Sequence, residues 1–139
     1  MNAVVQSDPV DDMEAMLLGS PEIETPTEHI FTPGLYVRQV TLPANSLIIG
    51  HRHRTEHFNV MLKGRMTVWM DGITQELAAP AVFVSFAGSR KVARIHEEVI
   101  FATIHPTTET DVARLEAQLF EKSPAWLKHH AQPKELCQQ

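Results

Sequence analysis

The sequence predicts a small all-β domain, an antiparallel sandwich or barrel, followed by one amphipathic helix. From Gly34 to His105, short β-prone runs alternate with turn residues, which is the pattern of antiparallel sheets. After Pro106 the apolar residues recur at helical spacing instead. A chain of 139 residues with 43% hydrophobic content can build one such domain and is too short for two.

Residues 1–33 are predicted to form an irregular N-terminal extension. Four prolines interrupt it: Pro9, Pro21, Pro26 and Pro33. Proline neither donates to a β-ladder nor continues a helix. One short helix is expected there, because Asp8 can cap it and Pro9 suits the first helical position.

The domain itself is expected to span residues 34–106 with eight strands. The predicted strands are 35–42, 46–53, 57–63, 65–70, 73–78, 81–86, 91–95 and 98–105. The Asp71-Gly72 pair is the clearest turn signal, because both residues tolerate the positive φ that a two-residue hairpin requires. Gly64 and Gly88 are expected to mark two further turns.

Residues 107–139 are predicted to be a C-terminal amphipathic helix and a polar tail. One apolar stripe supports the helix: Val112, Leu115, Leu119 and Phe120. Thr108 or Thr110 is available as its cap. Beyond Pro124, only Trp126 and Leu127 are expected to anchor the tail.

Charge and cysteine content exclude several classes of partner. The net charge is -5, so the chain offers no basic field for nucleic acid or anionic lipid, and no stretch approaches the length of a membrane span. Cys137 is the single cysteine. No intramolecular disulfide is therefore possible, and a cytoplasmic location is expected.

Three histidines, His51, His53 and His57, fall within seven positions. Residues two apart on a strand share a face, so His51 and His53 point the same way and His57 returns to that face after a short turn. Neutral imidazoles are ligands for iron, zinc, nickel or manganese. The three residues are therefore predicted to bind a divalent transition metal and leave positions open for substrate.

The segment from Gly50 to Gly64 resembles the first motif of the cupin superfamily: a glycine region, His-x-His, three or four residues, Glu, six residues and Gly. His51 and His53 match the paired histidines, and the spacing to Gly64 puts His57 at the position of the glutamate. Glu56 is expected to face away. The resemblance implies a jelly-roll barrel that holds a divalent metal and forms a homodimer.

The second cupin motif, Pro-x-Gly-x-x-His, is only partly present. Gly88 matches, but Lys91 stands where the histidine is expected. An ammonium group beside a metal is repelled unless it loses its proton. Lys91 should therefore be neutral, turn away, or indicate that no metal binds. A desolvated Lys91 is the candidate catalytic acid or base.

Neighbouring residues are assigned by strand phase. Asn59 and Met61 share the phase of His57 and are expected to line the pocket and contact substrate, while Leu47 and Ile49 would form its apolar floor. His96 is a reserve candidate for a fourth ligand. His105 ends a strand before a proline and could face the barrel mouth, although an edge position is favoured. Trp69 and Phe83 are assigned to packing.

Together these observations predict a metal-dependent cupin enzyme that acts on a small organic molecule, of oxygenase or isomerase/lyase type. The alternative is a non-catalytic cupin used as a ligand-binding, structural or assembly module. Replacement of the second-motif histidine by Lys91 and the length of the two extensions favour this alternative. The fold alone does not decide between them.

Overall fold

The computed structural model describes residues 8–20 and 23–131. The chain divides into two compact units, one made of Met1–Glu22 with Lys122–Gln139 and the other of Ile23–Glu121. In the described part of the chain, no helix is long and apolar enough to cross a membrane.

The terminal unit contains two short helices, α1 (Pro9–Leu17) and α3 (Pro124–His130). Asp8 caps α1 as predicted, its side chain accepting from the Val10 amide at 2.9 Å. The buried residues of α1 are Val10 and Glu14. The Glu14 carboxylate accepts a hydrogen bond from the Ser123 hydroxyl at the start of α3. This buried contact joins the two ends of the chain.

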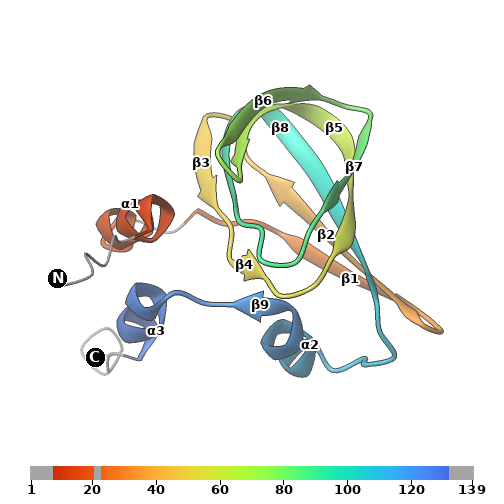
Figure 1. The fold of residues 1–139 in the computed structure, drawn as a ribbon. Helices are drawn as coiled ribbons and strands as arrows, with labels where there is room; N and C mark the ends of the chain where they lie inside the picture. The colour runs from red at the N-terminus through yellow and green to blue at the C-terminus, as the bar shows by residue number, and fades with distance from the viewer. Residues whose placement is uncertain (1–7, 21–22, 132–139) are drawn as a thin grey trace, which may run out of the picture. The chain divides into compact units, whose positions relative to one another are not determined.

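The larger unit is mostly β, as predicted, and Figure 1 shows its strands curving around a common interior. Its elements in chain order are β1 (Thr27–Thr32), β2 (Leu35–Leu42), β3 (Ser46–Ile49), β4 (Arg52–His53), β5 (His57–Met70), β6 (Ile73–Ala78), β7 (Ala81–Ser85), β8 (Lys91–Pro106), α2 (Val112–Leu119) and β9 (Phe120–Glu121).

Strands β5 and β8 form the centre of the sheet. The main pairing order is β1-β2-β8-β5-β6, with β3 also paired to β8 and β7 also paired to β5. All of these pairs are antiparallel. β4 and β9 make a separate two-stranded ribbon. Both long strands therefore have neighbours along most of their length.

Two predictions about strand boundaries are wrong because a bend was interpreted as a turn. The predicted strands 57–63 and 65–70 are one strand, β5, and Gly64 lies inside it with φ +93°. A Cβ on Gly64 would collide with the backbone oxygen of Glu98, and the β5-β8 register shifts around this point. These shifts are β-bulges, which bend a strand without ending it. The predicted break in β8 at 96–97 is likewise absent.

Two further differences concern the ends of the unit. Residues 27–32, expected to be irregular, form β1 on the edge of the sheet. Helix α2 is capped by Asp111, whose side chain accepts from the Arg114 amide at 3.0 Å, rather than by a threonine. The predicted helical stripe is otherwise present, because Leu115 and Leu119 are buried.

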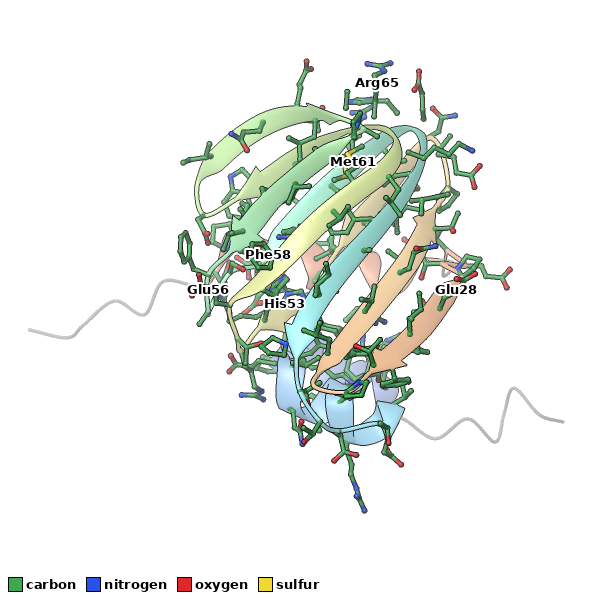
Figure 2. All side chains as sticks on the ribbon, turned by 90° about the vertical axis from the view of Figure 1, so that its right-hand side faces the viewer. Glu28, His53, Glu56, Phe58, Met61 and Arg65 are labelled. Atoms are coloured by element: carbon green, nitrogen blue, oxygen red, sulfur yellow. The ribbon has the colours of Figure 1, made fainter. Side chains whose placement is uncertain are left out.

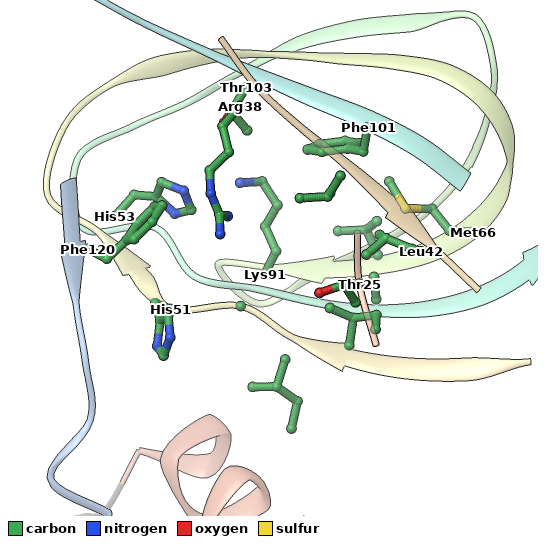
Figure 3. A pocket seen from close by; sticks show the side chains of 16 residues that line it. Thr25, Arg38, Leu42, His51, His53, Met66, Lys91, Phe101, Thr103 and Phe120 are labelled. Carbon is green, nitrogen blue, oxygen red and sulfur yellow. The ribbon is translucent and has the colours of Figure 1, made fainter. Parts of the chain in front are cut away.

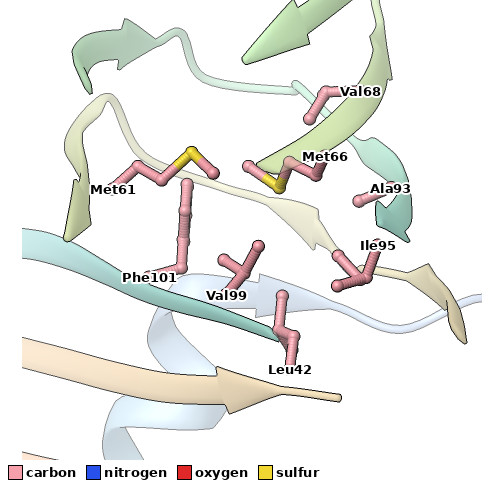
Figure 4. Close-up of a cluster of buried hydrophobic side chains, with 8 residues drawn as sticks. All are labelled: Leu42, Met61, Met66, Val68, Ala93, Ile95, Val99 and Phe101. Atoms are coloured by element: carbon pink, nitrogen blue, oxygen red, sulfur yellow. The ribbon is translucent and has the colours of Figure 1, made fainter. Parts of the chain in front are cut away.

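The apolar core lies where β5 and β8 bend, as Figure 4 shows. It consists of eight buried side chains: Leu42, Met61, Met66, Val68, Ala93, Ile95, Val99 and Phe101. Met61 and Val99 are fully buried. A second small cluster joins α2 to the sheet through Tyr36, Leu115, Leu119 and Phe120.

Candidate functional site

Three histidine rings from three different strands lie together in the larger unit. His53 comes from β4, His57 begins β5, and His105 is near the end of β8. Their ring centroids are 4.3 Å apart for His53 and His57, 4.9 Å for His57 and His105, and 6.2 Å for His53 and His105. The β5-β8 pairing, which sets Phe58 opposite Ile104, brings His57 beside His105.

Hydrogen bonds orient two of these rings and leave a ring nitrogen available on each. His57 Nδ1 lies 2.9 Å from the Thr55 carbonyl oxygen. Because a carbonyl only accepts, Nδ1 carries the proton and Nε2 has the lone pair. His105 Nε2 lies 2.8 Å from the Thr103 hydroxyl. Buried atoms without a hydrogen-bond partner in the described structure include His57 Nε2, His105 Nδ1 and His53 Nδ1.

The three imidazoles are held in their neutral form. Burial lowers the pKa of His53 to about 2, with neighbouring Lys91 and His57 contributing in the same direction. Burial also lowers the pKa of His105 to about 3. The pKa of His57 is lowered by burial, against an opposing effect of the Thr55 carbonyl. At neutral pH these rings therefore present lone pairs rather than positive charges.

His51 does not join this cluster. β3 ends at Ile49 and β4 begins at Arg52, so no continuous strand carries the side-chain alternation from one to the other. The His51 ring is 6.2 Å from the Phe120 ring, and Figure 3 shows it pointing away from His53. His57 is 3% exposed and belongs to the cluster, whereas Glu56 is exposed (Figure 2), in line with its predicted outward orientation.

His105 belongs to the cluster although the sequence favoured an edge position for it. It is fully buried rather than at an edge. Nothing in its local sequence indicates this position, because His105 lies beside His57 only through the pairing of β5 with β8, two strands that are far apart in the chain. His96, the reserve ligand, contacts the Thr67 hydroxyl at 2.7 Å and forms no ring contact with the other histidines.

A cavity of about 260 Å³ lies next to the cluster, inside the larger unit. Figure 3 shows His53 on its wall together with two cationic side chains, Arg38 and Lys91, that extend into it. Burial lowers the pKa of Lys91 to about 8, with the Asp71 carboxylate acting in the opposite direction. The rest of the lining is mostly apolar: Val40, Leu42, Ile48, Ile49, Met66, Val68, Ala93, Phe101 and Phe120.

The predicted substrate contacts lie outside the lining of this cavity. Met61 is fully buried in the apolar core. Asn59 is fully buried beside it, and its Nδ2 donates to the Ser85 hydroxyl at 2.7 Å and to the Phe83 carbonyl at 3.3 Å. Of the predicted apolar floor, Ile49 lines the cavity whereas Leu47 is 41% exposed.

The histidine cluster provides donor atoms of the kind that metals accept. Neutral imidazole nitrogens, buried and without partners, suit first-row divalent metals, and the carbonyl bond to His57 is the outer contact that metal-binding histidines usually make. In the described ranges, however, no group of three or more His, Cys, Asp and Glu side chains is arranged to hold a metal ion as it stands. The donor chemistry of the described histidines fits a metal, whereas their present arrangement does not.

The curved antiparallel sheet is that of a cupin, and the chain has a cupin fold. The similar solved structures include a salicylate 1,2-dioxygenase from Pseudaminobacter salicylatoxidans, with a TM-score of 0.58 and 14% identity over 77% of this chain. The chain spans 34% of that dioxygenase. No protein-family model and no curated protein sequence matches.

Two other solved structures are similar over more of their own length. A cupin superfamily protein from Desulfitobacterium hafniense matches with a TM-score of 0.53 and 11% identity, over 76% of this chain and 96% of that one. An RmlC-like cupin from Methanocaldococcus jannaschii matches with a TM-score of 0.52 and 12% identity, over 61% and 82%. At these identities the likeness concerns the fold alone.

Proposed function

We propose that this chain is a metal-dependent cupin enzyme that acts on a small organic molecule, with a reaction of oxygenase or isomerase/lyase type. One observation carries the proposal: three neutral imidazoles, two of them buried and that of His53 half-buried, lie together next to a cavity of about 260 Å³. For the fold, the proposal is that the sheet closes into the complete jelly-roll barrel of the cupins.

The residues proposed to hold the metal are His53, His57 and His105. This set replaces the sequence-based set, which contained His51 instead of His105. Iron, zinc, nickel and manganese all accept imidazole ligands, and when bound the ion would act as a Lewis acid or as the site of dioxygen chemistry. The Thr55 carbonyl and the Thr103 hydroxyl would fix the orientation of two of the rings.

The other residues of the cavity have separate roles in this proposal. His53 belongs to both the cluster and the cavity wall, so a bound molecule would lie beside the cluster. The pKa of Lys91 is about 8, which suits its Nζ to give or take a proton near neutral pH. The apolar lining would exclude water from the reacting atoms.

A homodimer is proposed through the outer face of β5 and β7. Four apolar side chains are more than half exposed there or just after β7: Phe58, Leu62, Val82 and Phe86. Exposed apolar patches of this kind mark association surfaces. Light scattering coupled to size-exclusion chromatography should give twice the chain mass, and Phe58→Glu should give the monomer mass.

A second candidate function is a non-catalytic ligand-binding cupin. The observation that favours it is the pair of cations, Arg38 and Lys91, which extend into the cavity and would repel a metal ion. In this case the histidines would be neutral packing partners, and the cavity alone would carry the function.

Metal content decides between the two candidates. Protein purified without a histidine tag, then dialysed against iron, zinc, nickel or manganese, should retain about one ion per chain by mass spectrometry for at least one metal. His53→Ala and His105→Ala should lose it, whereas His51→Ala and the matched control His96→Ala should keep it. Loss in His51→Ala but not in His105→Ala would restore the ligand set predicted from sequence.

Retention of no metal by the wild-type protein would overturn the enzyme proposal and leave the second candidate. If a metal is retained, oxygen consumption measured with a panel of small organic acids separates an oxygenase from an isomerase/lyase. The His53→Ala variant is the blank for that assay, because it keeps the cavity and lacks a proposed ligand.

A further inference from the structure

Two cationic side chains line the cavity without a carboxylate beside them in its lining. They are Arg38 from β2 and Lys91 from the start of β8, and among the described residues no Asp or Glu lines the cavity. Among the described residues, neither cation forms an ion pair. Arg38 Nε is also buried without a hydrogen-bond partner. Unpaired charge in such a place is costly unless a counter-charge binds.

The surroundings of Arg38 hold its guanidinium in place without neutralising it. The guanidinium carbon lies 5.1 Å from the centroid of the Phe120 ring, a cation–π contact. On β2, Arg38 is paired with Thr103 of β8, whose side chain also lines the cavity. Arg38 is thus a positioned donor, and a planar guanidinium is well suited to grip a carboxylate.

The remainder of the cavity defines the body of the ligand. Apart from His51, His53 and two threonines, the side chains around the two cations are apolar. A cavity of about 150 Å³ with an aliphatic and aromatic lining accommodates benzene, so about 260 Å³ leaves room for one ring or a short chain together with a charged group. A highly polar ligand such as a sugar phosphate would leave most of its hydroxyls unpaired here.

We propose that this cavity binds a small carboxylate with an apolar body, with Arg38 and Lys91 as its counter-ions. The inference rests on the proposed function, because it names the substrate class of the same site. The carboxylate lies between the two cations, the apolar body contacts Val40, Ile48 and Phe101, and His53 brings the histidine cluster next to the bound molecule. The site binds monoanions in preference to neutral molecules of the same shape.

Titration calorimetry with three acids and their neutral amides tests this inference. The probes are benzoate, salicylate and hexanoate, and each is compared with the corresponding amide on protein treated with EDTA. At least one acid should bind, and its amide should bind at least tenfold more weakly. Absence of binding by all three acids, or equal binding of acid and amide, would overturn the proposal.

Variants locate the binding to the two cations. Arg38→Met and Lys91→Met should each weaken binding of the acid at least tenfold and leave amide binding unchanged, and Arg38→Lys should recover part of the loss. Arg94→Met is the matched control, because Arg94 is an exposed cation on β8, and it should bind as the wild type does. Circular dichroism of each variant shows that a loss of binding is not a loss of fold.

The two proposals fail in different ways. The acid experiment uses EDTA-treated protein, so it does not require a bound metal. Protein that retains a metal but prefers no acid over its amide would keep the proposed function and lose the inference. Protein that binds an acid but retains no metal would keep the inference and lose the metal-dependent enzyme.

Discussion

The two ends of the interior of the larger unit are built from the same strands and behave in opposite ways. Near the bend of β5 and β8, the interior is apolar, with Met61, Ile95 and Val99 at most 1% exposed, and the other five core side chains also form one wall of the cavity. At the other end, the same two strands carry His57 and His105, and the interior holds unpaired ring nitrogens beside a cavity. The apolar end stabilises the fold, whereas the polar end lowers the stability of the fold and provides the candidate site.

The cost of the polar end follows from its chemistry. Buried polar atoms without partners reduce stability, and so do buried cations without counter-ions. A folded chain tolerates them only because the apolar end compensates. Removing side chains from the apolar end should therefore damage the fold, whereas removing selected groups from the polar end should damage binding and improve the fold.

The largest expected effect comes from the apolar end. Met61→Ala removes a fully buried side chain from the core and should lower the free energy of unfolding by about 2–5 kcal/mol, measured by urea denaturation. Metal retention of the folded fraction should not change, because Met61 does not line the cavity. A loss of metal with little loss of stability would contradict the separation of the two ends.

Acid should destabilise the fold through the polar end. The pKa of His105 is about 3 in the folded chain and close to 6.5 in the unfolded chain. Below pH 6.5, His105 is protonated in the unfolded chain but stays neutral in the folded chain. The free energy of unfolding therefore falls as the pH falls toward 3. The slope approaches about 1.4 kcal/mol per pH unit for one such histidine.

Urea denaturation between pH 7 and pH 4.5 measures this slope. His105→Asn should make the slope shallower, and the exposed His129→Asn, outside the sheet, should leave it as in the wild type. A His105→Asn variant with the full wild-type slope would show that other groups cause the acid sensitivity.

The smallest expected effect is an increase in the free energy of unfolding rather than a decrease. Arg38→Met replaces an unpaired cation of the polar end with an apolar side chain and should raise the free energy of unfolding by about 1 kcal/mol in the absence of ligand. Thermal unfolding measures the gain, with Arg94→Met as the surface control. A lower stability in Arg38→Met would mean that the guanidinium is already compensated within the folded chain.

The sequence predicted those strand bounds that are set by neighbouring residues in the chain. β6 has the predicted bounds, because the Asp71-Gly72 turn sets its start and both residues have the expected positive φ. β2 also has its predicted bounds. Gly64 was misinterpreted because positive φ serves a turn and a bulge equally well, and only the partner strand shows which one is present.

The site was only partly predictable for the same reason. His53 and His57 are close in the sequence and were found by their spacing. His105 and Arg38 lie on strands whose inward faces are set by pairing with β5 and β8, and neither belongs to a recognisable motif. His51 was expected on the face of His53 and His57 because strand alternation was assumed to continue through Gly50, where β3 has already ended, and its ring lies outside the cluster.

At the Gly64 bulge, β5 pairs with β8 in one register, and both ends of the interior depend on that register. Along a strand, a slip of one residue turns every side chain to the opposite face, and β5 carries His57, Met61 and Met66 on a single strand. Because a Cβ at Gly64 would collide with the Glu98 backbone, the observed register requires glycine at this position. A misaligned chain would expose its core and its histidines together, so an intact core implies a correctly assembled site.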